Sequence, residues 1–209
     1  MRPASRPPTA VNFLAHFLLA DRGDPALVGA FLGDFAKGPV TGFASDVATE
    51  ILVHRRIDSS CDAHPVMRTA RECFAPERRR LADIAMDVFH DHVLARDWPH
   101  HASEPLPVFT ARVYRALHEH ADLLPESARR VAARMAQQDW LAAYADFDGA
   151  RAALAGIGRR LSRGGDRLEA CAIDLQRHYV RLSEGFAPLF ADLRQIAEDT
   201  RRQAHARHG

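Results

Sequence analysis

The sequence has 209 residues, of which 47% are hydrophobic and 26% charged, the balance of an ordinary globular protein. Its 28 basic and 27 acidic side chains leave a formal net charge of +1, so a chain-wide attraction to nucleic acid or to a lipid surface is not expected. No apolar run is long enough to span a bilayer, the N-terminus lacks the apolar stretch of a signal peptide, and the three cysteines show no disulfide or zinc-ribbon spacing. We expect one cytoplasmic domain over residues 11–209, preceded by a disordered extension at 1–10.

The first two predicted helices each place one polar side chain on an apolar face. A helix over residues 11–21 carries His16 among apolar side chains at helical spacing. A second helix over 26–38 carries Asp34 on its apolar side and ends at a Gly-Pro pair. Taken singly, each has an ordinary explanation, as a hydrogen-bonded core histidine or as a carboxylate near a helix end.

A third helix, predicted over residues 44–60, carries a polar pair on its apolar stripe. His54 and Asp58 are four residues apart, so both side chains project from the same face. A single cation can bridge two groups at this spacing. A solvated ion pair is the ordinary alternative.

The central helix, predicted over residues 81–97, has a buried stripe that becomes acidic partway along. Asp87, Asp91 and His92 occupy or adjoin positions that continue the apolar face. An ionised carboxylate in an apolar interior is strongly disfavoured unless it is paired or bound to a metal. This helix therefore needs a cation or an equivalent partner beside it.

The remaining segments predict further helices and no strand. We expect a short helix at 64–74, amphipathic helices at 108–122 and 125–146, a helix over 148–166, and a long final helix from about 168 that Pro188 kinks or splits. The basic end at 201–209 is expected to fray. The fold class is therefore all-α, a single-domain helical bundle.

Four separate helices that each bring His or Asp to an apolar face indicate one polar pocket inside the bundle. Structural ion pairs rarely converge from four elements, so the pattern favours a metal site. A donor set of imidazole and carboxylate without thiolate suits Mn²⁺, Mg²⁺ or Fe²⁺ better than structural zinc. Arg55 and Arg56 follow His54 and project to different sides, so one could reach a phosphate, although two ordinary surface arginines are an equal alternative.

Four segments resemble, in spacing and order, the acyl carrier protein phosphodiesterases: VNFLAHFLLA at 11–20, GAFLGDFAKG at 29–38, HRRID at 54–58 and DVFHDH at 87–92. That family is a divergent relative of the all-helical, metal-dependent HD phosphohydrolases, which implies an HD-like bundle here. His90 and Asp91 form a His-Asp pair, while His92 fits the family's own Asp-His pattern. Either histidine is therefore a candidate to face the metal.

The resemblance implies a hydrolase that removes 4′-phosphopantetheine from holo-acyl carrier protein and leaves the apo protein. A divalent ion, most readily Mn²⁺, would activate water and polarise the phosphoryl oxygens. The implied metal ligands are His16, Asp34, His54, Asp58, Asp87, Asp91 and His92. Of these, His16 and Asp87 could instead orient the other ligands. The implied catalytic residues are Asp34, Asp91, Arg55 and Arg56, the arginines neutralising the phosphate or meeting the carrier protein.

The expected partner is the acidic acyl carrier protein, so a local basic rim is expected beside the pocket although the whole chain is nearly neutral. No nucleic-acid or membrane partner is expected, and the oligomeric state is open. Two alternatives remain. One is an HD-type phosphohydrolase acting on a nucleotide or another small phosphoester, and the other is a non-catalytic helical binding module whose Asp and His residues pair with arginines.

Overall fold

The computed structural model describes residues 13–161 and 163–206, and within these ranges the chain is helical with no strand. The all-α prediction is confirmed. The proposed extension at 1–10 lies outside the described residues. None of the helices in the described ranges combines the length and the apolar character needed to cross a membrane.

The first half of the chain forms five α-helices. The last of them lies between two short 3₁₀ turns at 79–81 and 98–100. The five helices are α1 (Phe13–Leu19), α2 (Asp24–Leu32), α3 (Ser45–Ala63), α4 (Pro65–Glu72) and α5 (Ala82–Arg96). The predicted helix over 26–38 is too long at its C-terminal end, because α2 ends at Leu32. Glycine and aspartate favour helix ends over helix interiors, and Gly33 and Asp34 follow directly.

The second half of the chain is divided into more helices than the sequence predicts. They are α6 (Leu106–Glu119), α7 (Glu126–Gln138), α8 (Trp140–Ala143), α9 (Phe147–Gly158), α10 (Gly165–Arg177), α11 (Tyr179–Glu184) and α12 (Phe186–Ala206). The single helix predicted over 125–146 is wrong, because Asp139 adopts a left-handed conformation (φ 45°) that separates α7 from α8. The expected split of the final helix occurs, but at His178 and Gly185, so that Pro188 lies in the first turn of α12.

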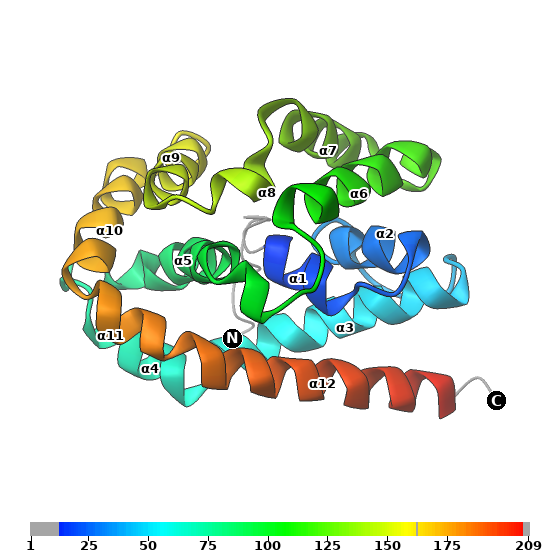
Figure 1. Ribbon diagram of the computed structural model, residues 1–209, viewed down its shortest axis with the longest axis horizontal. Coiled ribbons are helices and arrows are strands. Elements are labelled where there is room, and N and C mark those ends of the chain that lie inside the picture. The colour runs from blue at the N-terminus through cyan, green and yellow to red at the C-terminus, as the bar shows by residue number, and fades with distance from the viewer. Residues whose placement is uncertain (1–12, 162, 207–209) are drawn as a thin grey trace.

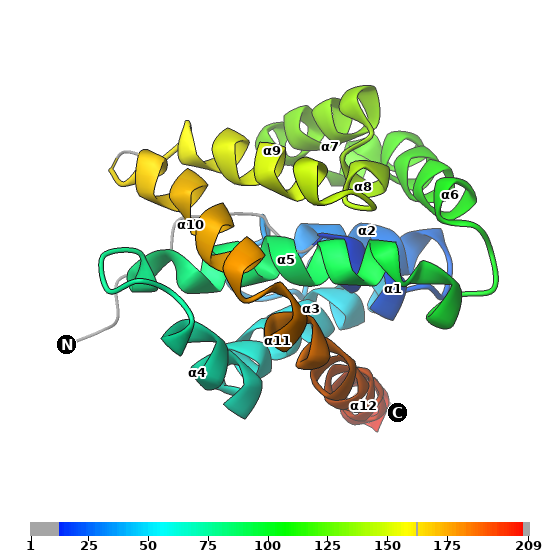
Figure 2. The same cartoon turned by 60° about the vertical axis from the view of Figure 1, so that its left-hand side comes forward.

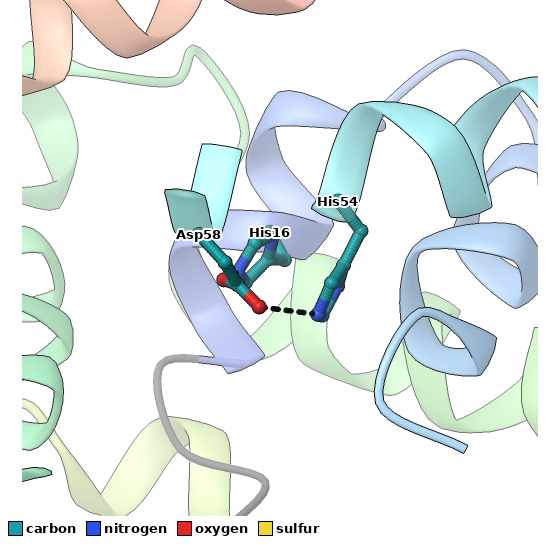
Figure 3. Close-up of side chains that lie close together, drawn as sticks. All are labelled: His16, His54 and Asp58. Atoms are coloured by element: carbon teal, nitrogen blue, oxygen red, sulfur yellow. Dashed lines mark hydrogen bonds and ion pairs between the residues drawn. The ribbon is translucent and has the colours of Figure 1, made fainter. Parts of the chain in front are cut away.

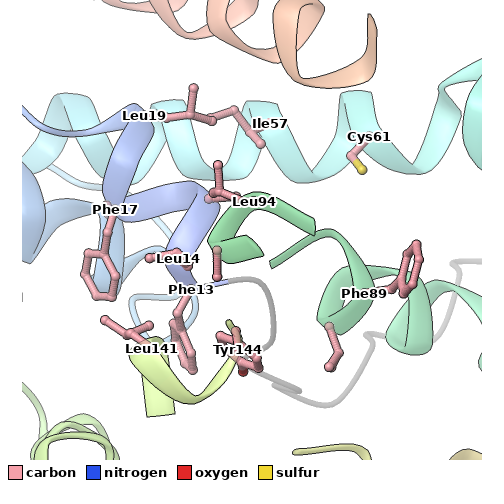
Figure 4. Packing of buried hydrophobic residues seen from close by; sticks show 14 of the residues in the cluster. Phe13, Leu14, Phe17, Leu19, Ile57, Cys61, Phe89, Leu94, Leu141 and Tyr144 are labelled. Atoms are coloured by element: carbon pink, nitrogen blue, oxygen red, sulfur yellow. The ribbon is translucent and has the colours of Figure 1, made fainter. Parts of the chain in front are cut away.

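Helix α1 lies near the centre of the bundle and contacts both α2 and α5 (Figures 1 and 2). Six of its seven residues are buried, including His16. Figure 4 shows the apolar cluster around it, with Phe13 and Leu14 near Leu141 and Tyr144. A polar side chain on this short helix is therefore held inside the core, and only a partner from a neighbouring helix can satisfy it.

Helices α2 and α3 pack unusually closely because glycine faces the contact. A Cβ atom on Gly29 would lie 2.5 Å from the carbonyl oxygen of Val47. No side chain larger than hydrogen fits there without moving α3. This approach places the end of α2 against the middle of α3, where His54 lies.

Helix α12 runs along α3, as Figure 1 shows, and a buried ion pair joins them. Arg201 donates to both carboxylate oxygens of Glu50, at 2.6 and 2.8 Å, and to the carbonyl oxygen of Leu19 at 2.7 Å. The prediction that this basic end frays is wrong for residues 201–206, because Arg201 is buried and bound to two other helices.

Candidate metal centre

Helices α1 and α3 bring two histidines and an aspartate together (Figure 3). The Nε2 atom of His16 donates to Asp58 Oδ1 at 3.0 Å, and His54 Nε2 lies 3.3 Å from Asp58 Oδ2. The two imidazole rings stack with centroids 3.8 Å apart. One donor atom from each of the three residues lies within 4.8 Å of the others, a spacing that a single ion can bridge.

Asp34 lies beside this cluster, two residues after the end of α2. Its Oδ1 atom is 3.7 Å from His54 Nε2. Among the described residues, four buried side-chain atoms lack a hydrogen-bond partner, and three of them are Asp34 Oδ2, His54 Nδ1 and His54 Nε2. Buried polar atoms are almost always satisfied, so this concentration marks a place where a ligand belongs. The donors are nitrogen and carboxylate oxygen, which fits a divalent transition ion.

Gly33 makes room for the His54 ring. A Cβ atom on this glycine would lie 2.1 Å from His54 Cγ and 2.4 Å from Cδ2. The ring therefore packs directly on the backbone of the residue that precedes Asp34. The spacing of polar residues along the sequence does not predict this role of Gly33, although a glycine directly before a polar residue at a helix end is a signal that points to it.

The electrostatic environment favours a cation among these groups. Burial alone would lower the pKa of His54, but the carboxylates of Asp34 and Asp58 raise it to about 10. Burial and the positive charge of His54 lower the pKa of His16. Although burial opposes ionisation of Asp58, the hydrogen bond to His16 and the nearby charge of His54 hold the pKa of its carboxyl well below the ordinary value. His54 therefore carries a proton that a divalent ion would displace.

The two arginines that follow His54 have different surroundings. Arg55 donates to the carbonyl oxygens of Ala36 at 2.6 Å and Gly38 at 2.9 Å. These contacts fix the segment that follows Asp34, so Arg55 supports the position of that carboxylate. Arg56 is exposed on the surface of α3.

Asp91, a residue of α5, is not part of the three-residue cluster, and its carboxylate lies against the first turn of α1. Its two carboxylate oxygens accept hydrogen bonds from the backbone N–H groups of Leu14 and Ala15, both at 2.9 Å. The side chain is fully buried, and burial raises its pKa to about 7 despite these two hydrogen bonds. Asp91 thus caps the helix that carries His16, which is a positioning role.

We expect Asp91→Asn to lower the thermal stability of the protein. An amide can accept one of these two hydrogen bonds, but its NH₂ group would face the other donor, at a cost of about 1–3 kcal/mol. For a chain of this size the melting temperature should fall by roughly 3–10 °C. Calorimetry measures the change, with exposed Asp122→Asn as the control. If the melting temperature is unchanged and metal binding is lost, Asp91 is instead a ligand of the ion.

His92 uses both ring nitrogens in contacts outside the cluster. Nδ1 lies 2.8 Å from the carbonyl oxygen of Tyr144, which can only accept, so Nδ1 carries the hydrogen. Nε2 then accepts from the hydroxyl group of Tyr179 at 2.7 Å, and that hydroxyl accepts from Arg96. The structure therefore uses His92 to join α5 to α8 and α11. It does not bring His92 together with His16 and His54.

Asp87 and His90, which are also on α5, lie outside the three-residue cluster. Asp87 is close enough to the Cys61 thiol that its charge, after burial, helps raise the pKa of that thiol. Cys61 is one turn beyond Asp58, so Asp87 lies toward that end of α3. His90 packs against Phe186, with ring centroids 5.7 Å apart, and its Nε2 atom has no hydrogen-bond partner.

His90 should make the protein sensitive to mild acid. Burial, with a smaller contribution from His64, lowers its pKa to about 4. Between pH 6.5 and 4 the unfolded chain binds a proton that folded His90 does not, so stability falls as the pH falls. The loss is at most on the order of 3 kcal/mol. Melting temperatures measured from pH 7 to 4.5 should fall less steeply for His90→Leu than for the wild type. Exposed His118→Leu is the control, and parallel curves for His90→Leu and the wild type would contradict this role.

Comparison with known proteins agrees with the resemblance seen in the sequence. Residues 11–193 match the family model described as acyl carrier protein phosphodiesterase. Curated proteins of that name from Salmonella dublin and Salmonella agona are 39% and 38% identical over 181 residues, which cover 84% of this chain and 92% of each relative. No solved structure matches the chain. The protein therefore belongs to the acyl carrier protein phosphodiesterase family, whose members are enzymes.

Proposed function

We propose that this protein is a metal-dependent phosphodiesterase that hydrolyses holo-acyl carrier protein to the apo protein and 4′-phosphopantetheine in the cytoplasm. The observation that carries the proposal is the convergence of His16, His54 and Asp58 from two helices, with donor atoms within 4.8 Å of one another. Relatives across 84% of the chain bear the name acyl carrier protein phosphodiesterase, which supports the substrate.

The donor set would hold one divalent ion, most readily Mn²⁺. His16, His54 and Asp58 are the proposed ligands, and Asp34 completes the set beside His54. Asp87 remains a proposed ligand or orienting residue from α5. When bound, such an ion supplies positive charge that polarises the phosphoryl group and offsets charge developing in the transition state.

The side chains around the ion site have separate tasks in this proposal. His16 and His54 are buried, whereas the Asp58 side chain is 46% exposed, so the phosphodiester approaches from the Asp58 side. Arg55 holds the segment after Asp34 through two carbonyl oxygens. Arg56 is exposed on the same helix and is the proposed contact for the phosphate or for the carrier protein.

A mass measurement on the carrier protein tests the proposal. The purified enzyme is treated with a chelator, supplied with Mn²⁺, and incubated with holo-acyl carrier protein. We expect the carrier protein to lose the mass of its 4′-phosphopantetheine arm when Mn²⁺ is present and to stay intact in the chelated sample. A parallel panel of nucleotides tests the HD-type alternative. Turnover confined to nucleotides, or no turnover and no bound metal, would overturn the proposal.

A further inference from the structure

Three arginines line a groove of about 670 Å³ formed by α7, α8 and α9. Arg134 lies on α7, and Arg159 and Arg160 follow the last residue of α9. Among the described residues, no carboxylate lines the groove and none forms an ion pair with these guanidinium groups. Burial and the charges of Arg134 and Arg159 lower the pKa of Arg160. The groove therefore concentrates positive charge that the chain itself does not neutralise.

The floor of this arginine groove, the side that α9 forms, consists mainly of small residues. Helix α9 presents Ala152, Ala153 and Gly156 to it. A Cβ atom on Gly156 would meet only Arg159 Nη2, at 3.7 Å, so the space above the helix is open. The guanidinium group of Arg160 lies over the ring of Trp140, 5.9 Å from its centroid, which adds an aromatic wall. A second helix can approach such a surface closely, with apolar residues on the floor and acidic residues toward the arginines.

The groove adjoins the helix that carries part of the proposed metal site. Phe13, the first residue of α1, lines the groove, and His16 follows one turn later on that helix. Figure 4 shows Phe13 near Tyr144, which also lines the groove. A partner bound here would lie beside the helix that holds His16.

We propose that the arginine groove receives an acidic helical segment of the carrier protein, an inference that rests on the proposed function. Charge complementarity selects this occupant, because the three unpaired cations on α7 and at the end of α9 match a row of carboxylates on one face of a helix. An isolated phosphate would engage only one end of this surface and would leave the apolar floor uncovered. The groove thus acts in substrate recognition, apart from the residues that hold the ion.

Charge reversal tests the role of the arginines. In Arg134→Glu and Arg159→Glu we expect the KM for holo-acyl carrier protein to rise roughly tenfold or more, with kcat nearly unchanged and a weaker dependence on salt. Arg129→Glu is the matched control, since Arg129 is exposed on α7 and does not line the groove. Binding of holo-acyl carrier protein to the chelated enzyme, measured by titration calorimetry, should weaken in the two groove variants alone.

Filling the groove tests its shape independently of its charge. Gly156→Leu places a side chain into open space, so the helix should fold at least as stably as the wild type. We expect its KM for the carrier protein to rise while its hydrolysis of a small diester, bis(p-nitrophenyl) phosphate, stays at the wild-type rate. Gly156→Ala, which adds only one carbon, should be close to the wild type in both assays.

The possible outcomes distinguish a wrong assignment of the groove from a wrong proposed function. If the wild type hydrolyses holo-acyl carrier protein and the groove variants match Arg129→Glu, the groove assignment is wrong and the proposed function stands. If the wild type does not hydrolyse the carrier protein, both fail. If the variants lose hydrolysis of the carrier protein and of the small diester alike, the groove serves the catalytic site generally and the docking assignment is overturned.

Discussion

Asp58→Asn is expected to abolish hydrolysis of holo-acyl carrier protein. The substitution keeps the size of the side chain but removes the negative charge that faces both His16 and His54. An amide is a much weaker ligand for a divalent ion, and the loss of several kcal/mol of transition-state stabilisation corresponds to roughly a thousandfold or more in rate. The fold should persist, because the Asp58 side chain is 46% exposed. Turnover by mass spectrometry and metal content after dialysis measure the two effects.

The matched control for this variant is Asp46→Asn, the same change on an exposed residue at the start of α3. It should retain normal turnover and metal content. Asp58→Asn with wild-type turnover would remove Asp58 from the site. Lost turnover with a normal metal content would show that the carboxylate acts on the substrate.

Gly33→Ala is expected to disable the site by steric means alone. The added methyl group would lie 2.1 Å from His54 Cγ, so the imidazole must move. His54 is buried and stacked on His16, which leaves little room for displacement. Overpacking of this kind costs about 1–3 kcal/mol of stability. A shift of about 1 Å in a metal-binding group is expected to reduce turnover by roughly a hundredfold or more.

Gly42→Ala is the control, because a Cβ atom there would have no neighbour within 4 Å. It should leave both the melting temperature and turnover unchanged. The decisive comparison is metal affinity, which Gly33→Ala should lower although every proposed ligand is still present. Undiminished affinity and turnover in Gly33→Ala would show that His54 need not occupy its present position.

Some of the site follows from sequence spacing, because it depends on helical geometry. His54 and Asp58 are one turn apart on α3, and the rule that such residues share a face is enough to place them together. His16 was expected on a buried face, and α1 buries it. Helix type and approximate extent follow from the same periodicity, and the all-α fold is therefore predictable.

Other features depend on contacts between distant segments, which one sequence does not reveal. The carboxylate of Asp91 binds backbone groups 77 and 76 residues away, and a buried carboxylate looks the same in sequence whether it caps a helix or binds an ion. His92 meets Tyr179, 87 residues later. The left-handed conformation of Asp139 cannot be anticipated from its residue type, since aspartate adopts it only where the surrounding structure requires it.

The bond between Arg201 and Glu50 spans 151 residues of sequence, and Glu50 lies one turn before His54 on α3. During synthesis the ribosome releases His16, His54 and Asp58 long before Arg201 is added. A nascent chain therefore holds all three donors while α3 still lacks its anchor on α12. We expect the proposed metal site to reach its final geometry only after Arg201 has emerged from the ribosome and bound Glu50.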